Sequence, residues 1–439
     1  NFMWLLAGQK APDHSTIARF RTGFLAEACE DLFYHMVRRL KDAEELSMET
    51  VFIDGTKLEA CANKYTFVWK KSVGKWEEKM FHKIQEAVRL LNHDYMQLFT
   101  VNAESRAQDL QKISDYLEEK CQQDGTEFVY GRGRRKSKNQ KYLELFQRFR
   151  ERQVTYDWHT ASFQGRNNYC KTDPDATFMH MKDDHMRNAQ LKPGYNIQIG
   201  VDSEYIVSAD VFQDRNDVWT LVPFLKMMDK KLGFRYPSVT ADSGYESEEG
   251  YTYLRSSGQK PYIKPQTYEK WKKRSFKQDI SKRENMGYDK ETDTYTCHAG
   301  KKLKALFVKK QKSKSGYESE VTVYECEDCA NCPHKEKCTR AKGNKRLYIS
   351  KSFLEKRQES YENILSETGI QYRMNRSIQV EGAFGVLKND YEFQRFLLRG
   401  KTKVKLEILL LCMGYNLNKL HAKIQKERTR TYLFEVQSA

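Results

Sequence analysis

The 439-residue chain is expected to form an α/β fold, a mixed sheet core flanked by helices, with an N-terminal helical domain, a helical insert and a cysteine-rich insert. Three observations indicate this. Strand-like runs begin after residue 174 and are interrupted by a helical segment. No proline occurs between Pro12 and Pro174, which permits long helices there. Five cysteines gather in a lysine-rich stretch between residues 297 and 338.

Residues 1–47 are predicted to form the helical domain. A helix begins at Ser15, and the apolar positions that follow repeat with helical period: Ile17, Phe20, Phe24, Ala28, Leu32 and Met36. The segment also carries four arginines that would suit DNA binding, Arg19, Arg21, Arg38 and Arg39. A plain helical bundle explains the pattern at least as well.

The α/β core is predicted in two parts, residues 48–266 and 351–439. Its first strand lies at 49–54, and a helical insert at about 70–160 separates this strand from the rest. The later strand candidates are ATFMHMK, GYNIQIGVD, YIVSADVF, PSVTAD and KPYIKP. The helical insert carries an apolar stripe formed by Met80, Ile84, Val88, Leu91, Tyr95 and Leu98. Residues 267–350 form a basic, cysteine-rich insert between the two parts of the core.

Basic residues outnumber acidic ones, with 76 Lys and Arg against 60 Asp and Glu and a formal net charge of +16. This excess favours a polyanionic partner, nucleic acid before membrane, although a well-solvated basic surface has the same composition. The most apolar run, LEILLLCMGY at 406–415, is shorter than the roughly 18 residues of a membrane span. We therefore expect no contact with a membrane.

The first ten residues, NFMWLLAGQK, lack the basic leader and the cleavage site of a signal peptide, and we expect further residues before them. Five cysteines are scattered as free thiols are in a reducing cytoplasm, namely Cys29, Cys61, Cys121, Cys170 and Cys412. A cytoplasmic protein is the expectation.

Two aspartates directly follow strand-like runs. Asp54 ends VFID before Gly55, and Asp242 ends SVTAD before Ser243 and Gly244. Each has an ordinary explanation: a hairpin turn for Asp54, and an Asx turn or a helix cap for Asp242. Neighbouring strands lie only about 4.8 Å apart, so two strand-end carboxylates of one sheet can nevertheless converge.

A third acid, Glu381, lies on a helix predicted at 376–392. One face of this helix is apolar, and the adjacent face carries Glu381, Gly385 and Lys388. A solvated Glu–Lys face would explain this pattern. Against it, Gly382 and Gly385 cost about 1 kcal/mol each relative to alanine in a helix. Glycines make sense at that cost where another backbone, such as a DNA strand, comes close. The apolar face consists of Val380, Ala383, Phe384, Leu387 and Tyr391.

Two aspartates and a glutamate are hard oxygen ligands of the kind that Mg²⁺ prefers. A pair of such ions activates a water or a 3′-hydroxyl and stabilises the leaving oxygen in an in-line phosphoryl displacement. We therefore expect Asp54, Asp242 and Glu381 to be catalytic and to hold two Mg²⁺ (or Mn²⁺) ions. Asp214 and Asp217 are reserve candidates, although turn and cap roles explain them.

The stretch CEDCANCPHKEKC is predicted to bind a metal. It places Cys326, Cys329, Cys332 and Cys338 in a C-x2-C-x2-C-x5-C array. Four thiolates this close suit tetrahedral Zn²⁺, and such a closed site would be structural. An iron–sulfur cluster has similar spacing, Cys297 or His334 could replace one ligand, and chance clustering of free thiols is the weaker rival.

Three motifs carry a family resemblance. FIDGTKLEA, TADSGYES and VEGAFGVLKND, in this order and with the cysteine-rich stretch between the last two, resemble the DDE transposases of bacterial insertion sequences. MWLL…PDHSTIARFR, DPDATFMHMK and KPGYNIQIGVD resemble one subgroup of them. The resemblance implies an RNase H-like core with Asp54, Asp242 and Glu381 as its acids. It also implies cleavage of element ends and strand transfer to target double-stranded DNA, by a homodimer at the bacterial nucleoid.

Related groups carry Tyr-x2-Arg-x3-Glu-x6-Lys around the glutamate, and Lys388 matches the lysine. Arg376 lies one residue from the expected arginine position, and Tyr372 lies two residues before the expected tyrosine position. We expect Lys388, Arg376 and Tyr372 to contact DNA. On an ideal α-helix Arg376 points about 140° away from Glu381, so it is expected to help only from a loop.

Two other functions share these features. A non-catalytic or domesticated DNA-binding protein would keep the transposase fold without its chemistry. An RNase H-like nuclease of DNA repair would share the acids and lack strand joining.

Overall fold

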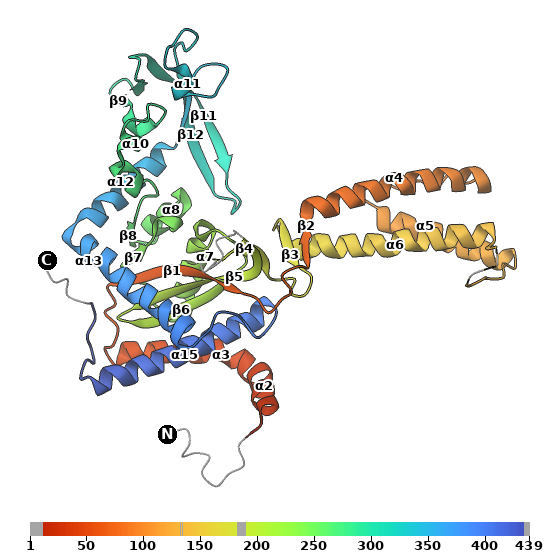
Figure 1. Ribbon diagram of the computed structural model, residues 1–439, viewed down its shortest axis with the longest axis horizontal. Coiled ribbons are helices and arrows are strands. Elements are labelled where there is room, and N and C mark those ends of the chain that lie inside the picture. Colours follow the sequence, from red (N-terminus) through yellow and green to blue (C-terminus); the bar gives the residue numbers. More distant parts are fainter. Residues whose placement is uncertain (1–11, 132, 134, 182–189, 434–439) are drawn as a thin grey trace. The chain divides into compact units, whose positions relative to one another are not determined.

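The structure, a computed structural model, describes residues 12–131, 133, 135–181 and 190–433 (Figure 1). The MWLL segment of the family resemblance lies outside these residues. The chain folds into two compact units. The sheet unit comprises the described parts of 1–58 and 195–439, and the helical unit comprises those of 59–194.

A mixed sheet of six strands organises the fold. The strand order is β4–β5–β1–β7–β8, with β6 paired to β5. Strands β1, β7 and β8 are parallel, whereas β6 and β4 run antiparallel to β5. Because parallel strands are covered on both faces, β1 begins as an unbroken apolar run. The strands are β1 (Thr50–Glu59), β4 (Thr177–His180), β5 (Leu191–Asp202), β6 (Tyr205–Phe212), β7 (Ser238–Ala241) and β8 (Lys260–Ile263).

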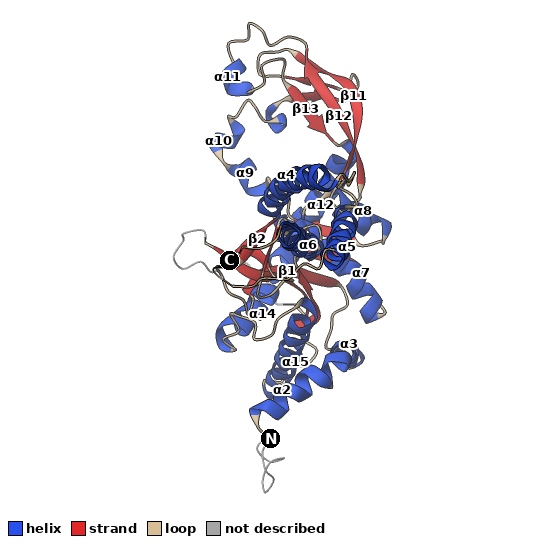
Figure 2. Cartoon of the chain, turned by 90° about the vertical axis from the view of Figure 1, so that its right-hand side faces the viewer, coloured by secondary structure: helices blue, strands red, loops and turns tan. Residues whose placement is uncertain are grey.

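A second sheet, of five antiparallel strands, is formed by the cysteine-rich part of the sheet unit. Its order is β13–β12–β11–β10–β9, and β11 to β13 lie side by side in Figure 2. The tip of the β11–β12 hairpin contacts the rest of the unit, since Lys314 Nζ lies 2.6 Å from Asp214 Oδ1. The elements are β9 (Gly287–Asp289), β10 (Thr294–Thr296), β11 (Lys302–Lys312), β12 (Glu318–Cys326), β13 (Arg346–Ile349), α9 (Tyr268–Lys272), α10 (Arg274–Lys277), η3 (Arg283–Asn285) and α11 (Lys335–Cys338).

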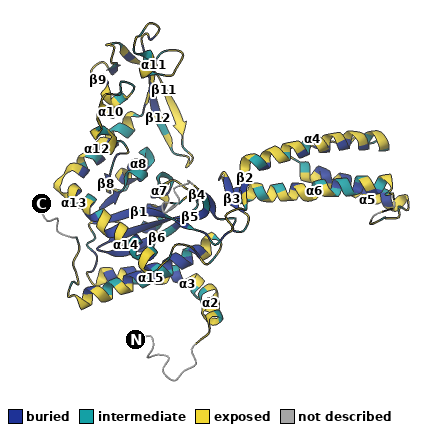
Figure 3. Ribbon diagram, in the orientation of Figure 1, coloured by how far each residue is buried: buried dark blue, intermediate teal, exposed yellow. Residues whose placement is uncertain are grey.

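Helices cover the strands of the central sheet, which are largely buried in Figure 3. Helix α15 packs on β6 and α3, while α12 and α13 pack on β8 and β7. This arrangement confirms the mixed α/β core and fits an RNase H-like fold. The helical elements are α2 (His14–Gly23), α3 (Leu25–Asp42), η1 (Asp217–Trp219), α7 (Leu221–Leu232), η2 (Ser243–Tyr245), α8 (Glu248–Ser256), α12 (Lys351–Leu365), α13 (Glu367–Arg376) and α15 (Lys401–Gln425).

The first described helix differs from its prediction in two respects. It begins at His14, because Asp13 and not Ser15 caps it, accepting a hydrogen bond of 2.6 Å from the Thr16 backbone N–H. Its apolar stripe is also exposed, at Ile17 and Phe20 in particular. Among the described residues, no helix combines the length and apolar composition needed to cross a bilayer.

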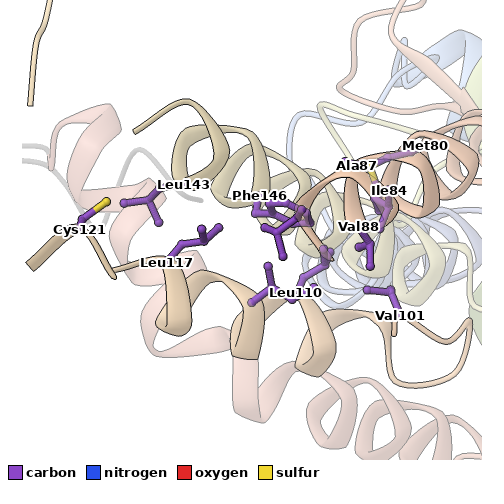
Figure 4. Close-up of a cluster of buried hydrophobic side chains, with 12 residues drawn as sticks. Met80, Ile84, Ala87, Val88, Val101, Leu110, Leu117, Cys121, Leu143 and Phe146 are labelled. Atoms are coloured by element: carbon purple, nitrogen blue, oxygen red, sulfur yellow. The ribbon is translucent and has the colours of Figure 1, made fainter. Parts of the chain in front are cut away.

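Three long helices make up most of the helical unit: α4 (Lys70–Tyr95), α5 (Arg106–Gln123) and α6 (Lys138–Phe163). A two-stranded sheet, β2 (Phe67–Trp69) and β3 (Asn168–Cys170), accompanies them. Their buried core (Figure 4) includes Met80, Ile84, Val88 and Leu91 of the predicted stripe. Leu98 is instead 95% exposed, because α4 ends at Tyr95 and Met96 takes a left-handed conformation with φ of 52°.

Candidate active site

Asp54 and Asp242 occupy equivalent positions on neighbouring parallel strands. The pairing of β1 with β7 ends at Ile53 opposite Ala241, and the next residue on each strand is the acid. Asp54 Oδ1 accepts a hydrogen bond of 2.8 Å from the Gly55 N–H. The two aspartates therefore follow the last paired residues of adjacent parallel strands.

The local structure differs for the two aspartates. The hairpin turn considered for Asp54 and Gly55 does not form, since β1 continues to Glu59. Asp242 does cap a helical turn, η2, and its Oδ1 accepts a hydrogen bond of 2.7 Å from the Ser243 N–H. Asp54 thus lies within a continuous strand, at the point where β7 stops pairing with it.

A group of hydrogen-bonded polar side chains, Gln198, Tyr245 and Asp217, packs beside Asp54 and forms the polar floor of the site. A Cβ on Gly55 would lie 2.2 Å from Gln198 Nε2, so a larger residue there would displace the Gln198 side chain. The Tyr245 hydroxyl donates to Gln198 Oε1, and Gln198 Nε2 donates to Asp217 Oδ1 at 3.1 Å. Burial, followed by the negative charges of Asp217 and Asp54, holds the pKa of Tyr245 well above its usual value. Tyr245 therefore remains a protonated hydrogen-bond donor beneath the acids.

The polar residues of β5 in this floor were not identified from the sequence. Asn196 and Gln198 are both buried, and Asn196 Nδ2 donates to Asp217 Oδ1 at 2.7 Å. Their signal was available in the strand GYNIQIGVD, where two amides at alternate positions interrupt an apolar run and must point to the same side of the sheet. Asp217 was a reserve candidate, and it lies in this hydrogen-bonded group.

Glu381 is brought toward Asp54 by an irregular helix. After α13, the helix continues as a π-helical turn η4 (Ser377–Glu381), then α14 (Gly382–Gly385) and a second π turn η5 (Val386–Asp390). A π turn has i→i+5 hydrogen bonds, so residues five apart lie on one face. The expectation that Arg376 faces away from Glu381 was therefore wrong, because it assumed α-helical geometry throughout.

Arg376 lies between two of the three acids. Its Nη1 is 3.4 Å from Asp54 Oδ2, and its Nη2 is 3.4 Å from Glu381 Oε1. The side chains of Arg376 and Asp54 are each 15% exposed, whereas that of Glu381 is 60% exposed. Arg376 thus supplies positive charge inside the site, and Glu381 stands at its rim.

The donor atoms suit a hard divalent cation, because all three acids offer carboxylate oxygens. Arg376 nevertheless links only two of the three acids, Asp54 and Glu381. In the described part of the chain, no group of three or more His, Cys, Asp or Glu side chains surrounds a common position for an ion. A metal held by all three acids would require the Arg376 side chain to move.

A basic pocket of about 390 Å³ opens beside Asp242. Lys264, Arg373 and Arg376 line it. Lys264 pairs with Glu269 at 2.6 Å. Arg373 Nε and Arg376 Nη1 are buried and lack a hydrogen-bond partner among the described residues. Buried polar atoms are usually satisfied, so these two arginines are suited to an anionic ligand such as a phosphate.

Comparison with known families gives a match for the segment that contains the helix of Arg376 and Glu381. Residues 296–421 match the family model of the transposase DDE domain. This segment is thus similar to a transposase DDE domain. The matched residues include Arg376 and Glu381 but neither Asp54 nor Asp242. The resemblance to DDE transposases is confirmed, whereas the subgroup remains a prediction. No curated protein and no solved structure matches the chain.

Tyr372 of α13 and Lys388 of η5 have different surroundings. Lys388 is half-buried in η5. Tyr372 is only 6% exposed, and its ring packs edge-on against Phe52 and Tyr262, with centroids 6.0 and 5.0 Å away. Its hydroxyl donates to Glu49 Oε2 at 3.4 Å. We therefore assign Tyr372 to the packing of α13 on the sheet and correct the expected DNA contact.

A buried ion pair anchors the chain that follows Asp242. Glu246 Oε1 lies 2.8 Å from Arg357 Nε of α12, and Glu246 Oε2 accepts a hydrogen bond of 2.7 Å from the Gln266 N–H. The Arg357 guanidinium lies over the Trp271 ring at 5.3 Å. The second acid of DSGYES thus connects the aspartate turn to α12.

The cysteines of the second sheet surround a small cavity of about 20 Å³. Burial and a hydrogen bond with the Cys329 thiol raise the pKa of Cys326 to about 12. The rings of His298 and His334, which also line the cavity, lie 5.0 Å apart. The fold therefore brings a fifth cysteine, Cys297 from the β10–β11 turn, beside the predicted four. The lining thiols are Cys297, Cys326, Cys329, Cys332 and Cys338.

Proposed function

We propose that the protein is a DNA transposase, which cleaves the ends of an insertion sequence and transfers the strands to target DNA. The observation that supports this proposal is that Asp54 and Asp242 each directly follow the paired residues of β1 and β7, in a chain whose residues 296–421 match a transposase DDE domain. Arg376 connects this pair to Glu381 of the matched domain.

Asp54, Asp242 and Glu381 would hold two Mg²⁺ or Mn²⁺ ions. When bound, such ions supply an activated water or 3′-hydroxyl and neutralise charge on the phosphate. The residues of the chain orient the substrate around them. Without ions, the Arg376 guanidinium balances the charge of Asp54 and Glu381 at the contacts described above.

The basic pocket beside Asp242 would hold a phosphate of the DNA strand. Arg373 Nε is buried and has no hydrogen-bond partner among the described residues, so it could donate a charge-assisted hydrogen bond to a phosphate. Arg376 adds positive charge beside it, although its Nη1 lies 3.4 Å from Asp54 Oδ2. Lys388 extends the positive charge along the same helix. Because transposition joins two element ends, we propose that the protein acts as a homodimer on double-stranded DNA.

The cysteine-lined cavity would hold a structural Zn²⁺ only if its thiols drew closer together, because no three described Cys or His side chains surround a common position for an ion in the structure. Four thiolates among Cys326, Cys329, Cys332, Cys338 and Cys297 suffice for tetrahedral coordination. A cavity of about 20 Å³ accommodates one small ion. Metal binding would deprotonate the thiols and join the β10–β11 turn to the segment after β12.

A strand-cleavage assay tests the proposal. Asp242→Asn removes one carboxylate charge and is expected to reduce Mg²⁺-dependent cleavage of element-end DNA at least about 100-fold. The matched control is Asp214→Asn, because Asp214 pairs with Lys314 outside the site. Undiminished cutting by the Asp242 variant would exclude its role as a metal ligand.

The same assay separates the alternatives. Wild-type protein should produce both cleaved ends and joined strands when Mg²⁺ or Mn²⁺ is added. Cleavage without joining would favour a nuclease. The absence of any nicking would favour a DNA-binding protein that keeps the fold alone.

A further inference from the structure

A basic groove lies between α4 and α6 of the helical unit. Its volume is about 770 Å³, and four cations line it: Lys79, Lys83, Arg148 and Arg152. Glu151 is its single acid. All four cations are exposed.

Ion pairs of the helical unit use other cations, such as Arg106 with Glu77 and Lys136 with Glu144. Within the described ranges, no ion pair includes any of the four. Lys79 and Lys83 are four residues apart on α4, as are Arg148 and Arg152 on α6, and like charges at this spacing destabilise a helix. An anionic ligand would relieve that repulsion.

The groove has an apolar floor. Met80 belongs to the buried core of the unit, and Leu145, Phe149 and Tyr156 pack against that core. A cleft with charges of one sign above a wall of low dielectric constant concentrates the electrostatic potential. The groove is therefore a stronger attractor of anions than the same lysines and arginines on a flat surface.

The general basicity of the chain does not explain this groove. A second pocket, of about 540 Å³, lies between α5 and α6 and is lined by Glu118 and Glu144 and by no lysine or arginine. The two pockets of the helical unit thus differ in charge.

We propose that the groove between α4 and α6 binds the phosphate backbone of duplex DNA. Four exposed cations line this groove on two helices, and contacts of such cations with phosphates supply affinity without reading sequence. The proposal goes beyond the acid site because it assigns a separate DNA-binding surface to the helical unit. It relies on the proposed function only for the choice of DNA over RNA.

Fluorescence anisotropy with a labelled 30-bp DNA duplex tests this inference. The full chain is titrated without added Mg²⁺ or Mn²⁺ at several KCl concentrations, so that cleavage plays no part. The variant K79Q/K83Q/R148Q/R152Q keeps side chains with good helix propensity. If all four contact phosphates, the slope of log affinity against log salt falls by about 3.6, at about 0.9 per contact.

The matched control is R89Q/K112Q/K120Q/K141Q, which removes four exposed or ion-paired cations of the same helical unit outside the groove. Its slope is expected to change by less than about 1. An unchanged slope in the groove variant, or an equal loss in the control, contradicts the inference, as does preferential binding of an RNA duplex. Loss of cleavage in Asp242→Asn with normal duplex binding concerns the acid site alone, so the two proposals fail separately.

Discussion

Arg376 contacts two acids that would otherwise repel each other and any approaching phosphate. It stands 3.4 Å from both Asp54 and Glu381, and little of it is exposed. In a site that takes up divalent cations, such an arginine competes with the metal for the same carboxylates. Binding of a metal ion to Asp54 and Glu381 would therefore require the Arg376 side chain to move away from them.

The variant Arg376→Gln tests this competition. Without added metal, we expect it to lower the free energy of unfolding by about 1–3 kcal/mol, because two carboxylates lose their counter-charge. Mg²⁺ should then raise the melting temperature more in the variant than in the wild type. Thermal unfolding with and without Mg²⁺ measures both effects. Equal Mg²⁺ shifts in the two proteins would show that Arg376 does not compete with the ion.

Tyr372 is expected to affect stability and not DNA affinity. Tyr372→Ala removes a ring packed on Phe52 and Tyr262 and should cost about 3–5 kcal/mol. Tyr372→Phe loses only the hydrogen bond to Glu49 and should cost less than about 1.5 kcal/mol. Urea denaturation and duplex binding measure the two properties. A fully stable Tyr372→Phe protein with weakened DNA binding would restore the DNA contact predicted from the sequence.

The helix from α13 to η5 combines an ordinary buried face with an unusual polar one. Val380, Ala383 and Phe384 are buried. The π turns shift the polar face, and π turns within helices often occur at functional sites. Gly382 adjoins Glu381, and a Cβ added there would meet nothing within 4 Å.

Gly382→Ala should therefore stabilise the protein and impair its chemistry. Alanine gains about 0.5–1 kcal/mol over glycine in a helix. If a DNA backbone approaches this position, the added methyl group lowers the rate of strand cleavage. Gly414→Ala in α15 is the control, since a Cβ there also meets nothing within 4 Å. Equal cleavage rates in the two variants would argue against a close backbone at Gly382.

The sequence predicted features that depend on local periodicity and missed those that depend on its interruption. The apolar stripe of the Glu381 helix was predicted, because the buried positions keep their spacing. The contact between Arg376 and Glu381 was not, since no residue pattern revealed the π turn. The prediction that Leu98 belongs to the apolar stripe was wrong for a related reason. Nothing in the stripe marked the end of α4 at Tyr95.

Strand pairing was predictable only in outline. Two acids after β-rich runs indicated a common sheet edge, and the register of β1 and β7 places both immediately after the paired residues. The polar floor from β5 was missed, because its contribution depends on which strand lies next to β1. That choice is made by tertiary packing and not by the local sequence.

The whole molecule combines two units, and the cysteine-rich sheet lies within one of them. The cysteine-rich sheet has its own buried core, which includes Tyr295, Leu303 and Tyr324. Its hairpin contacts the rest of the unit through polar groups, including Lys314 with Asp214. Loss of a bound metal would therefore unfold this segment before the central sheet.

Chelation tests that expectation. Removing Zn²⁺ should abolish hydrogen-exchange protection in β9 to β13, because metal binding is coupled to folding in small cysteine-rich segments. Protection in β1, β5 and β7 should remain. Elemental analysis of the purified protein gives the metal content. Unfolding of the central sheet together with β9 to β13 would show that the segment is not an independent folding unit.

A crystal of the protein soaked in Mn²⁺ and measured at the manganese absorption edge would examine the acid site itself. We predict anomalous density at about 2.1 Å from carboxylate oxygens of Asp54 and Asp242, with Arg376 withdrawn from Asp54. Manganese bound only elsewhere, with the contact between Arg376 and Asp54 intact, would contradict a catalytic metal site at these acids.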